Sequence, residues 1–198
     1  MITHRRACDI AGLELETVRK ARRRHPELLL SEWFMSRSDG VDRSTILFLT
    51  TYARATAFGI PVQPAAEAAW VFTEFSDVAT HCVADGSPSY VRGPAELYPE
   101  GRTFLVITRP LVGAKAGPLT GGFDARMVNL RWEETMADVL AKLGFFNSQG
   151  SPDVGIAALI DLNAVVEHVD AALTETRTPA QERADEIAEI EAAMTDCA

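Results

Sequence analysis

The chain has 198 residues, of which 47% are hydrophobic and 24% are charged, and its formal net charge at pH 7 is -9. This length allows one domain or two small ones, and the composition is that of an ordinary globular protein. No apolar run approaches the ~20 residues that a membrane span needs, and the N-terminus lacks the apolar core of a signal peptide, so we expect a cytoplasmic protein without a membrane partner.

The cysteines give no sign of a cross-linked or metal-binding fold. Cys8, Cys82 and Cys197 are few, odd in number and widely spaced, so they form neither a disulfide framework nor a zinc pair. His81 precedes Cys82, but a metal site needs more ligands than two neighbours. We therefore expect no metal and no cofactor, and we expect Cys8 to be buried as a small apolar residue.

Two short helices open the chain. The first is expected over residues 4–11, and Gly12 is expected to end it, because glycine readily adopts a positive φ. The second is expected from Glu14 to Arg24. Its apolar face has the helical spacing Leu15, Val18, Ala21. The exposed faces then carry the cations Arg19, Lys20, Arg22 and Arg23.

This cation cluster is unusual in so acidic a protein. Residues 1–43 carry nine Lys and Arg against seven Asp and Glu, whereas residues 175–198 carry two against seven. A dense cluster on the helix after a glycine turn predicts contact with phosphates and base edges of DNA. The alternative interpretation of the cluster is a solvent-exposed helix face without a binding role, because most runs of charged residues have none.

A wing and two further helices are expected next. Residues 36–43 contain the turn dipeptide Asp39-Gly40, and a two-stranded wing there would carry Arg37 and Arg43 at its tip. Ser44 is predicted to cap a helix over residues 45–58 that Gly59 ends. An alanine-rich helix is expected from Ala65 to Phe75, and periodicity is lost over residues 76–101.

The sequence of the second half of the chain predicts both strands and helices. Strands are expected at Arg102–Thr108, Ala125–Trp132 and Val154–Leu162, the first two as a hairpin. Helices are expected over residues 132–143 and 162–173, the latter capped by Asp161. Thr178-Pro179 has the pattern of a helix start and opens an acidic amphipathic helix.

Together these elements predict an α+β protein in three parts. Residues 1–79 are expected to form a winged helix-turn-helix domain that binds DNA. Residues 80–173 are expected to form a small α+β domain for dimerisation, ligand binding or partner binding, and residues 174–198 the acidic helix. A domain boundary is placed near residue 80 because the Pro- and Gly-rich stretch begins there.

The segment Gly12-Leu13-x-x-x-Thr17-Val18-Arg19 resembles the helix-turn-helix signature of the MerR family of bacterial transcription regulators. The order of the following elements is similar over about the first 75 residues. The resemblance implies that Thr17 and Arg19 contact a backbone phosphate and a base edge, and that Arg37 and Arg43 hold flanking phosphates. Lys20 and Ala21 stand where the family has two aromatic residues, and no long dimerising helix follows.

The function expected from the sequence is a sequence-specific, non-enzymatic transcription regulator. Its helix 14–24 would read the major groove of double-stranded DNA, with Arg19 as the reader and Lys20, Arg22 and Arg23 as phosphate contacts. A homodimer is expected, because one short recognition helix rarely gives enough affinity, and RNA polymerase or another protein is a further candidate partner. The alternative is a phage assembly or antitoxin-type interaction protein that reuses the helix-turn-helix fold.

Overall fold

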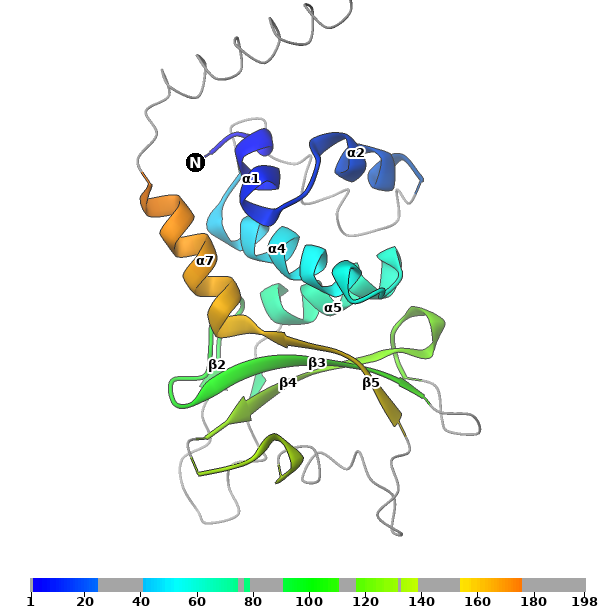
Figure 1. Cartoon of the computed structure of the whole chain (residues 1–198), viewed down its shortest axis with the longest axis vertical. Coiled ribbons are helices and arrows are strands. Elements are labelled where there is room, and N and C mark those ends of the chain that lie inside the picture. Colours follow the sequence, from blue (N-terminus) through cyan, green and yellow to red (C-terminus); the bar gives the residue numbers. More distant parts are fainter. Residues whose placement is uncertain are drawn as a thin grey trace, which may run out of the picture.

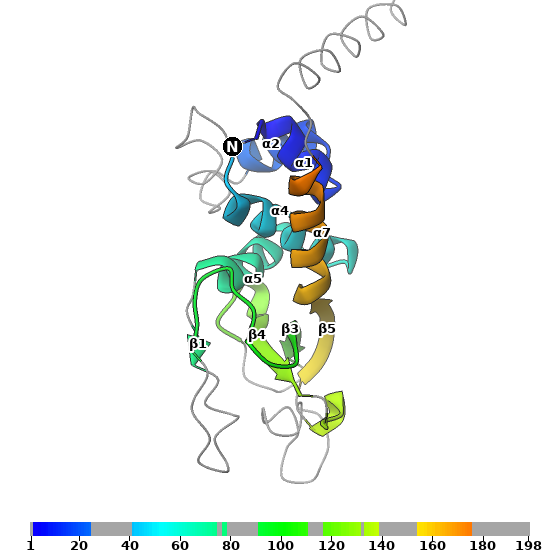
Figure 2. The same ribbon diagram turned by 90° about the vertical axis from the view of Figure 1, so that its left-hand side faces the viewer.

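The computed structural model describes residues 2–24, 41–74, 77–78, 91–110, 117–131, 133–138 and 154–175. In this part of the chain, helices cover one face of a three-stranded antiparallel sheet (Figure 1). The helices α1 (His4–Ala11) and α2 (Leu15–Arg24) lie farthest from the sheet in both views (Figure 2). The predicted α+β class is confirmed, and the winged helix-turn-helix remains a prediction.

The turn between α1 and α2 has the conformation expected from its glycine. The side chain of Thr3 accepts a hydrogen bond from the Arg6 amide at the start of α1. At the other end Gly12 adopts φ 69°, and its amide donates to the carbonyl of Asp9 while Leu13 donates to Cys8. A left-handed residue at this position ends a helix without the steric cost that a β-carbon would add. The turn therefore redirects the chain into α2 within three residues.

Helix α4 (Arg43–Ala57) lies where a helix was predicted, but its cap was predicted wrongly. The cap is Asp42, whose carboxylate accepts from the amide of Thr45 at 2.9 Å and from its hydroxyl at 2.7 Å. Ser44 therefore lies inside the first turn. The buried residues of α4 are distributed around the helix, because neighbours pack on several sides: Ile46, Leu47, Phe48, Leu49, Tyr52 and Ala55.

Helix α5 (Val62–Glu74) begins three residues earlier than predicted. Pro64 lies in its first turn, where a missing amide hydrogen removes no bond within the helix. Gly59, at φ 81°, makes the bend between α4 and α5. The alanine-rich sequence of α5 allows close packing, and its alanines are buried against α4 and the sheet: Ala65, Ala66, Ala68 and Ala69.

The sheet has the strand order β4-β3-β5, formed by β3 (Arg102–Pro110), β4 (Asp124–Leu130) and β5 (Val154–Asp161). The predicted hairpin is confirmed, since β3 and β4 pair in antiparallel register from Arg102 opposite Leu130. The pairing of β3 with β5 shifts between Ile107 and Thr108, which marks a β-bulge. A separate two-stranded ribbon joins β1 (Asp77–Val78) to β2 (Val91–Arg92).

Helix α7 (Leu162–Thr174) follows β5 directly and confirms the prediction that Asp161 caps it. The Asp161 carboxylate accepts from the Ala164 amide at 3.2 Å. Helix α7 returns beside α4 and holds α1 through two bonds: Arg6 donates to the Ala172 carbonyl at 3.2 Å, and the His168 ring lies 2.8 Å from the Ile10 carbonyl.

One apolar core joins the helices that precede residue 80 to the sheet that follows it. Buried Phe48 and Phe72 belong to the same cluster as Leu105 and Ile160 of the sheet and Val169 of α7. Helix α4 contacts α7 and β5, and α5 contacts β3 and β4. The predicted boundary between residues 1–79 and 80–173 therefore runs across a shared core.

A buried arginine fixes the end of α5. Arg92 is 1% exposed, and its guanidinium Nη1 donates to the carbonyls of Phe72 at 3.0 Å, Gly93 at 2.9 Å and Glu96 at 3.2 Å. The carbonyl of Phe72 is one of the last four of α5, which no amide of the helix itself can satisfy. The guanidinium also lies 5.9 Å from the centroid of the Phe72 ring. One side chain thus ties the end of the helix to the loop before β3.

An ion pair links the beginning of α4 to α7. Arg43 Nε donates to Asp170 Oδ1 at 2.6 Å, and Nη2 donates to Oδ2 at 2.9 Å. Both side chains are nearly half exposed. The bidentate geometry gives the pair directional strength, and solvent screens it.

Replacing Asp170 with asparagine is expected to lower the free energy of unfolding at pH 7 by no more than about 1 kcal/mol, the range for exposed pairs. The Arg43 guanidinium holds the pKa of Asp170 below its usual 3.8. The unfolded chain therefore takes up this proton first as the pH falls, and the stabilisation is lost as the pH passes through the lower folded-state pKa. Urea titrations at pH 7 and at about pH 2 should show a larger loss at pH 7 than at the lower pH. An equal loss at both pH values would contradict the assignment.

Candidate nucleic-acid interface

Helix α2 places its apolar and charged residues on different faces. Val18 is 2% exposed and packs into the core, and Leu15 is partly buried beside it. Thr17, Arg19 and Lys20 are exposed on the same helix. Helix α2 itself lies at the end of the molecule away from the sheet in both views (Figures 1 and 2).

Four of the residues predicted to contact DNA on α2 have described side chains, and all four are exposed: Thr17, Arg19, Lys20 and Arg23. Arg19 Nη1 lies 2.7 Å from Glu16 Oε1 within the helix, and both side chains are more than half exposed. The hydroxyl of Thr17 donates to Glu14 Oε2 at 3.3 Å. Arg19 and Thr17 thus have acidic partners one turn earlier, which hold them in defined positions while leaving them open to solvent.

The charges of α2 act on one another. Its Glu16 has a pKa lowered from the usual value, first by the hydrogen bond from Arg19 and then by the positive charges of Arg19, Arg23 and Lys20. The acidic residue lies in the first turn and the cations lie toward the C-terminus, the arrangement that the helix dipole favours. The cations of α2 therefore outnumber its one acidic residue and lie after it along the helix.

The other predicted contacts are not brought together with this face. Arg37 lies outside the described residues, as does the side chain of Arg22. Arg43 is the first residue of α4, and its guanidinium is engaged by Asp170 of α7. Val41 pairs with Ile2 through an isolated antiparallel bridge, so the chain start lies beside the segment that leads into α4. The predicted wing falls mostly outside the described part.

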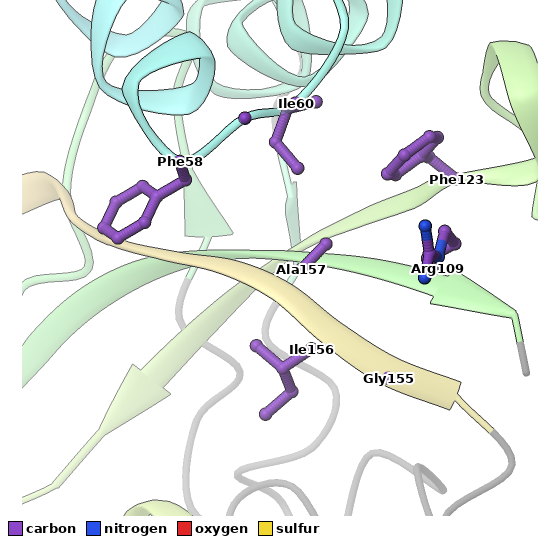
Figure 3. A pocket seen from close by; sticks show the side chains of 8 residues that line it. Phe58, Ile60, Arg109, Phe123, Gly155, Ile156 and Ala157 are labelled. Atoms are coloured by element: carbon purple, nitrogen blue, oxygen red, sulfur yellow. The ribbon is translucent and has the colours of Figure 1, made fainter.

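A pocket that the sequence did not predict lies between the α4–α5 turn and the sheet (Figure 3). Its volume is about 260 Å³. Phe58 and Ile60 line it from the turn, Arg109 from β3 and Phe123 from the residue before β4. No local pattern could reveal it, because these residues come from separate elements and Arg109 lies beyond the end of the predicted strand.

Other kinds of site have less support in the described part of the chain. None of its helices combines the length and the apolar character required to cross a bilayer. Within the same ranges, no three His, Cys, Asp or Glu side chains gather in a way that could hold a metal ion. Cys8 is buried as predicted, and burial raises the pKa of its thiol to about 11, which keeps it protonated and unreactive at neutral pH.

Comparison with known proteins gives no relative from which a role could be transferred. The candidate interface therefore stands on the position and charge of the α2 side chains alone. No protein-family model matches the chain, no curated protein matches its sequence, and no solved structure matches its fold.

Proposed function

We propose that this protein binds double-stranded DNA in a sequence-specific manner and regulates transcription, with α2 in the major groove. The observation that carries the proposal is the α1–Gly12–α2 unit. A left-handed glycine at φ 69° ends α1, buried Val18 anchors the next helix, and exposed cations cover its outer face. Two helices joined by a short glycine turn, the second of them presented to solvent, is the arrangement by which helix-turn-helix proteins reach base edges.

The charge distribution supports a local and oriented contact. The whole chain carries a formal charge of -9, which repels DNA from most of its surface. Arg19, Lys20 and Arg23 present positive charge at the end farthest from the sheet. The protein would therefore approach DNA with α2 first.

We assign each residue of the candidate interface a proposed role in DNA binding. Arg19, held by Glu16, is the candidate for a bidentate contact with a guanine edge. Thr17, Lys20 and Arg23 are candidates for phosphate contacts, which position the helix without reading sequence. The guanidinium of Arg43 would have to leave Asp170 to reach a phosphate, so Arg43 adds least to the proposal.

A random-site selection with the full chain is the direct test. We expect an enriched duplex, and we expect Arg19→Ala to weaken binding to it by about 1–3 kcal/mol and to relax specificity at one position. Lys20→Ala and Arg23→Ala should weaken binding to every sequence and reduce the salt dependence by about one unit each. Fluorescence anisotropy over a range of salt concentrations measures all three.

A matched control separates these effects from a general loss of positive charge. Arg126→Ala removes the same charge from an exposed residue on the sheet, away from α2. It should leave the affinity for DNA within about twofold of the original protein. Failure of the selection to enrich any sequence would overturn the proposal and leave the protein-interaction alternative.

A further inference from the structure

Exposed apolar side chains line the pocket beside the α4–α5 turn. Two large hydrophobic residues in this part of the chain are strongly exposed, Phe58 at 57% and Ile156 at 49%, and both line this pocket. Figure 3 shows Phe58 above β5 and Ile156 projecting from the other side of that strand. Phe58, Ile60 and Phe123 lie on the helix side of the sheet around this hollow (Figure 3). Large apolar side chains around a hollow on a protein surface commonly mark a binding site.

Arg109 carries a positive charge that forms no ion pair with the described residues. The neighbouring arginines of the sheet region are engaged: Arg102 pairs with Asp161 at 2.6 Å, Arg126 with Asp124 at 2.8 Å, and Arg92 with carbonyls. Arg109 is exposed and makes no ion pair with any residue of the described ranges. No acidic residue of the described ranges therefore competes with an anion for its guanidinium.

The strand register explains why this guanidinium is open to the pocket. Arg109 pairs with Gly155 of β5, which has no side chain to cover it on the same face of the sheet. Figure 3 places Arg109 beside Phe123 and on the same side of the sheet as Ile60. A ligand in the pocket would meet a positive charge at one end and apolar side chains along its length.

We propose that this pocket binds a small organic acid that has one carboxylate and an apolar body. The carboxylate accepts two hydrogen bonds from Arg109, the geometry in which guanidinium and carboxylate fit best. The apolar body lies against Phe123 and Ile60 and reaches toward Phe58. The volume of about 260 Å³ equals that of roughly nine waters, which suits an acid of about ten non-hydrogen atoms.

Phenylacetate has this size and chemistry and serves as the probe. Its binding to the full chain is measured by chemical-shift changes in amide NMR spectra, in which Gly59 and Gly155 report on the two sides of the pocket. For a ligand of this size we expect a Kd on the order of 1 mM or tighter. Phenylacetamide, which has the same shape and no charge, should bind at least tenfold more weakly.

Two arginine variants test where the carboxylate lies. Arg109→Gln should weaken phenylacetate binding by roughly 10- to 100-fold and leave phenylacetamide unchanged. Arg126→Gln, which removes the same charge from β4, should leave both affinities as they are. Equal affinity for the acid and the amide, an unaltered Kd in Arg109→Gln, or no shifts at Gly59 and Gly155 up to a concentration on the order of 10 mM would each overturn the assignment.

Discussion

Replacing Arg92 with leucine is expected to lower the free energy of unfolding by about 3 kcal/mol, because three carbonyls at the end of α5 and in the following loop lose a charged donor that is itself buried. The carbonyls of Phe72 and Gly93 keep bonds from the amides of Ala95 and Glu96, and all three carbonyls, that of Glu96 included, lose their bond from Arg92. Leucine fills much of the space, so the loss reports on the hydrogen bonds more than on a cavity. Thermal unfolding followed by circular dichroism should show a midpoint lower by roughly 6–12 °C.

Arg102 provides the matched control for this substitution. It lies on β3, is about half exposed, and pairs with Asp161 at the surface. Arg102→Leu should cost less than about 1 kcal/mol, as exposed ion pairs generally do. Equal losses for the two variants would show that the carbonyl contacts of Arg92 do not stabilise the end of α5.

A fragment of residues 1–79 is expected not to fold on its own. Helix α4 is buried on several sides, and part of its cover comes from α7 and β5, which the fragment lacks. The alanine-rich face of α5 loses the sheet beneath it. Removing these partners exposes a large part of the apolar core, and the remaining burial cannot offset the chain entropy lost on folding.

The fragment is tested by heat and by NMR. We expect no cooperative thermal transition and poorly dispersed amide signals, whereas the full chain unfolds cooperatively. A cooperative transition in the fragment would instead support the separate N-terminal domain predicted from the sequence. The outcome also decides whether DNA binding can be studied with residues 1–79 or requires the full chain.

Local patterns were enough to predict most of the elements. Helical spacing and a glycine predicted α1, the turn at Gly12 and α2, because these depend on residues within a few positions of one another. The helix cap of α4 shows the limit of such reasoning. Asp42 and Ser44 are both good capping residues, and the choice between them depends on the hydroxyl of Thr45, which donates to the same Asp42 oxygen as its own amide.

Features that depend on distant residues could not be predicted. Arg43 was expected at the tip of a wing, and its partner Asp170 stands 127 positions away. Arg92 lies in a stretch whose periodicity is lost, and nothing local indicates that its guanidinium is buried under α5. The candidate DNA-binding residues of α2 are the opposite case, since burial of Val18 and exposure of its neighbours follow directly from helical geometry.

The bridge between Ile2 and Val41 has a consequence for how the protein could read DNA. It closes the segment that contains α1 and α2 at both of its ends, and α1 is further held by Arg6 and His168. Helix α2, which we propose reads DNA, therefore lies in a segment whose two ends are joined to each other, and its Val18 packs into the core. In a dimer, the distance between the two copies of α2 would be fixed by the body, so operators should tolerate one half-site spacing and reject insertions of a single base pair between the half-sites.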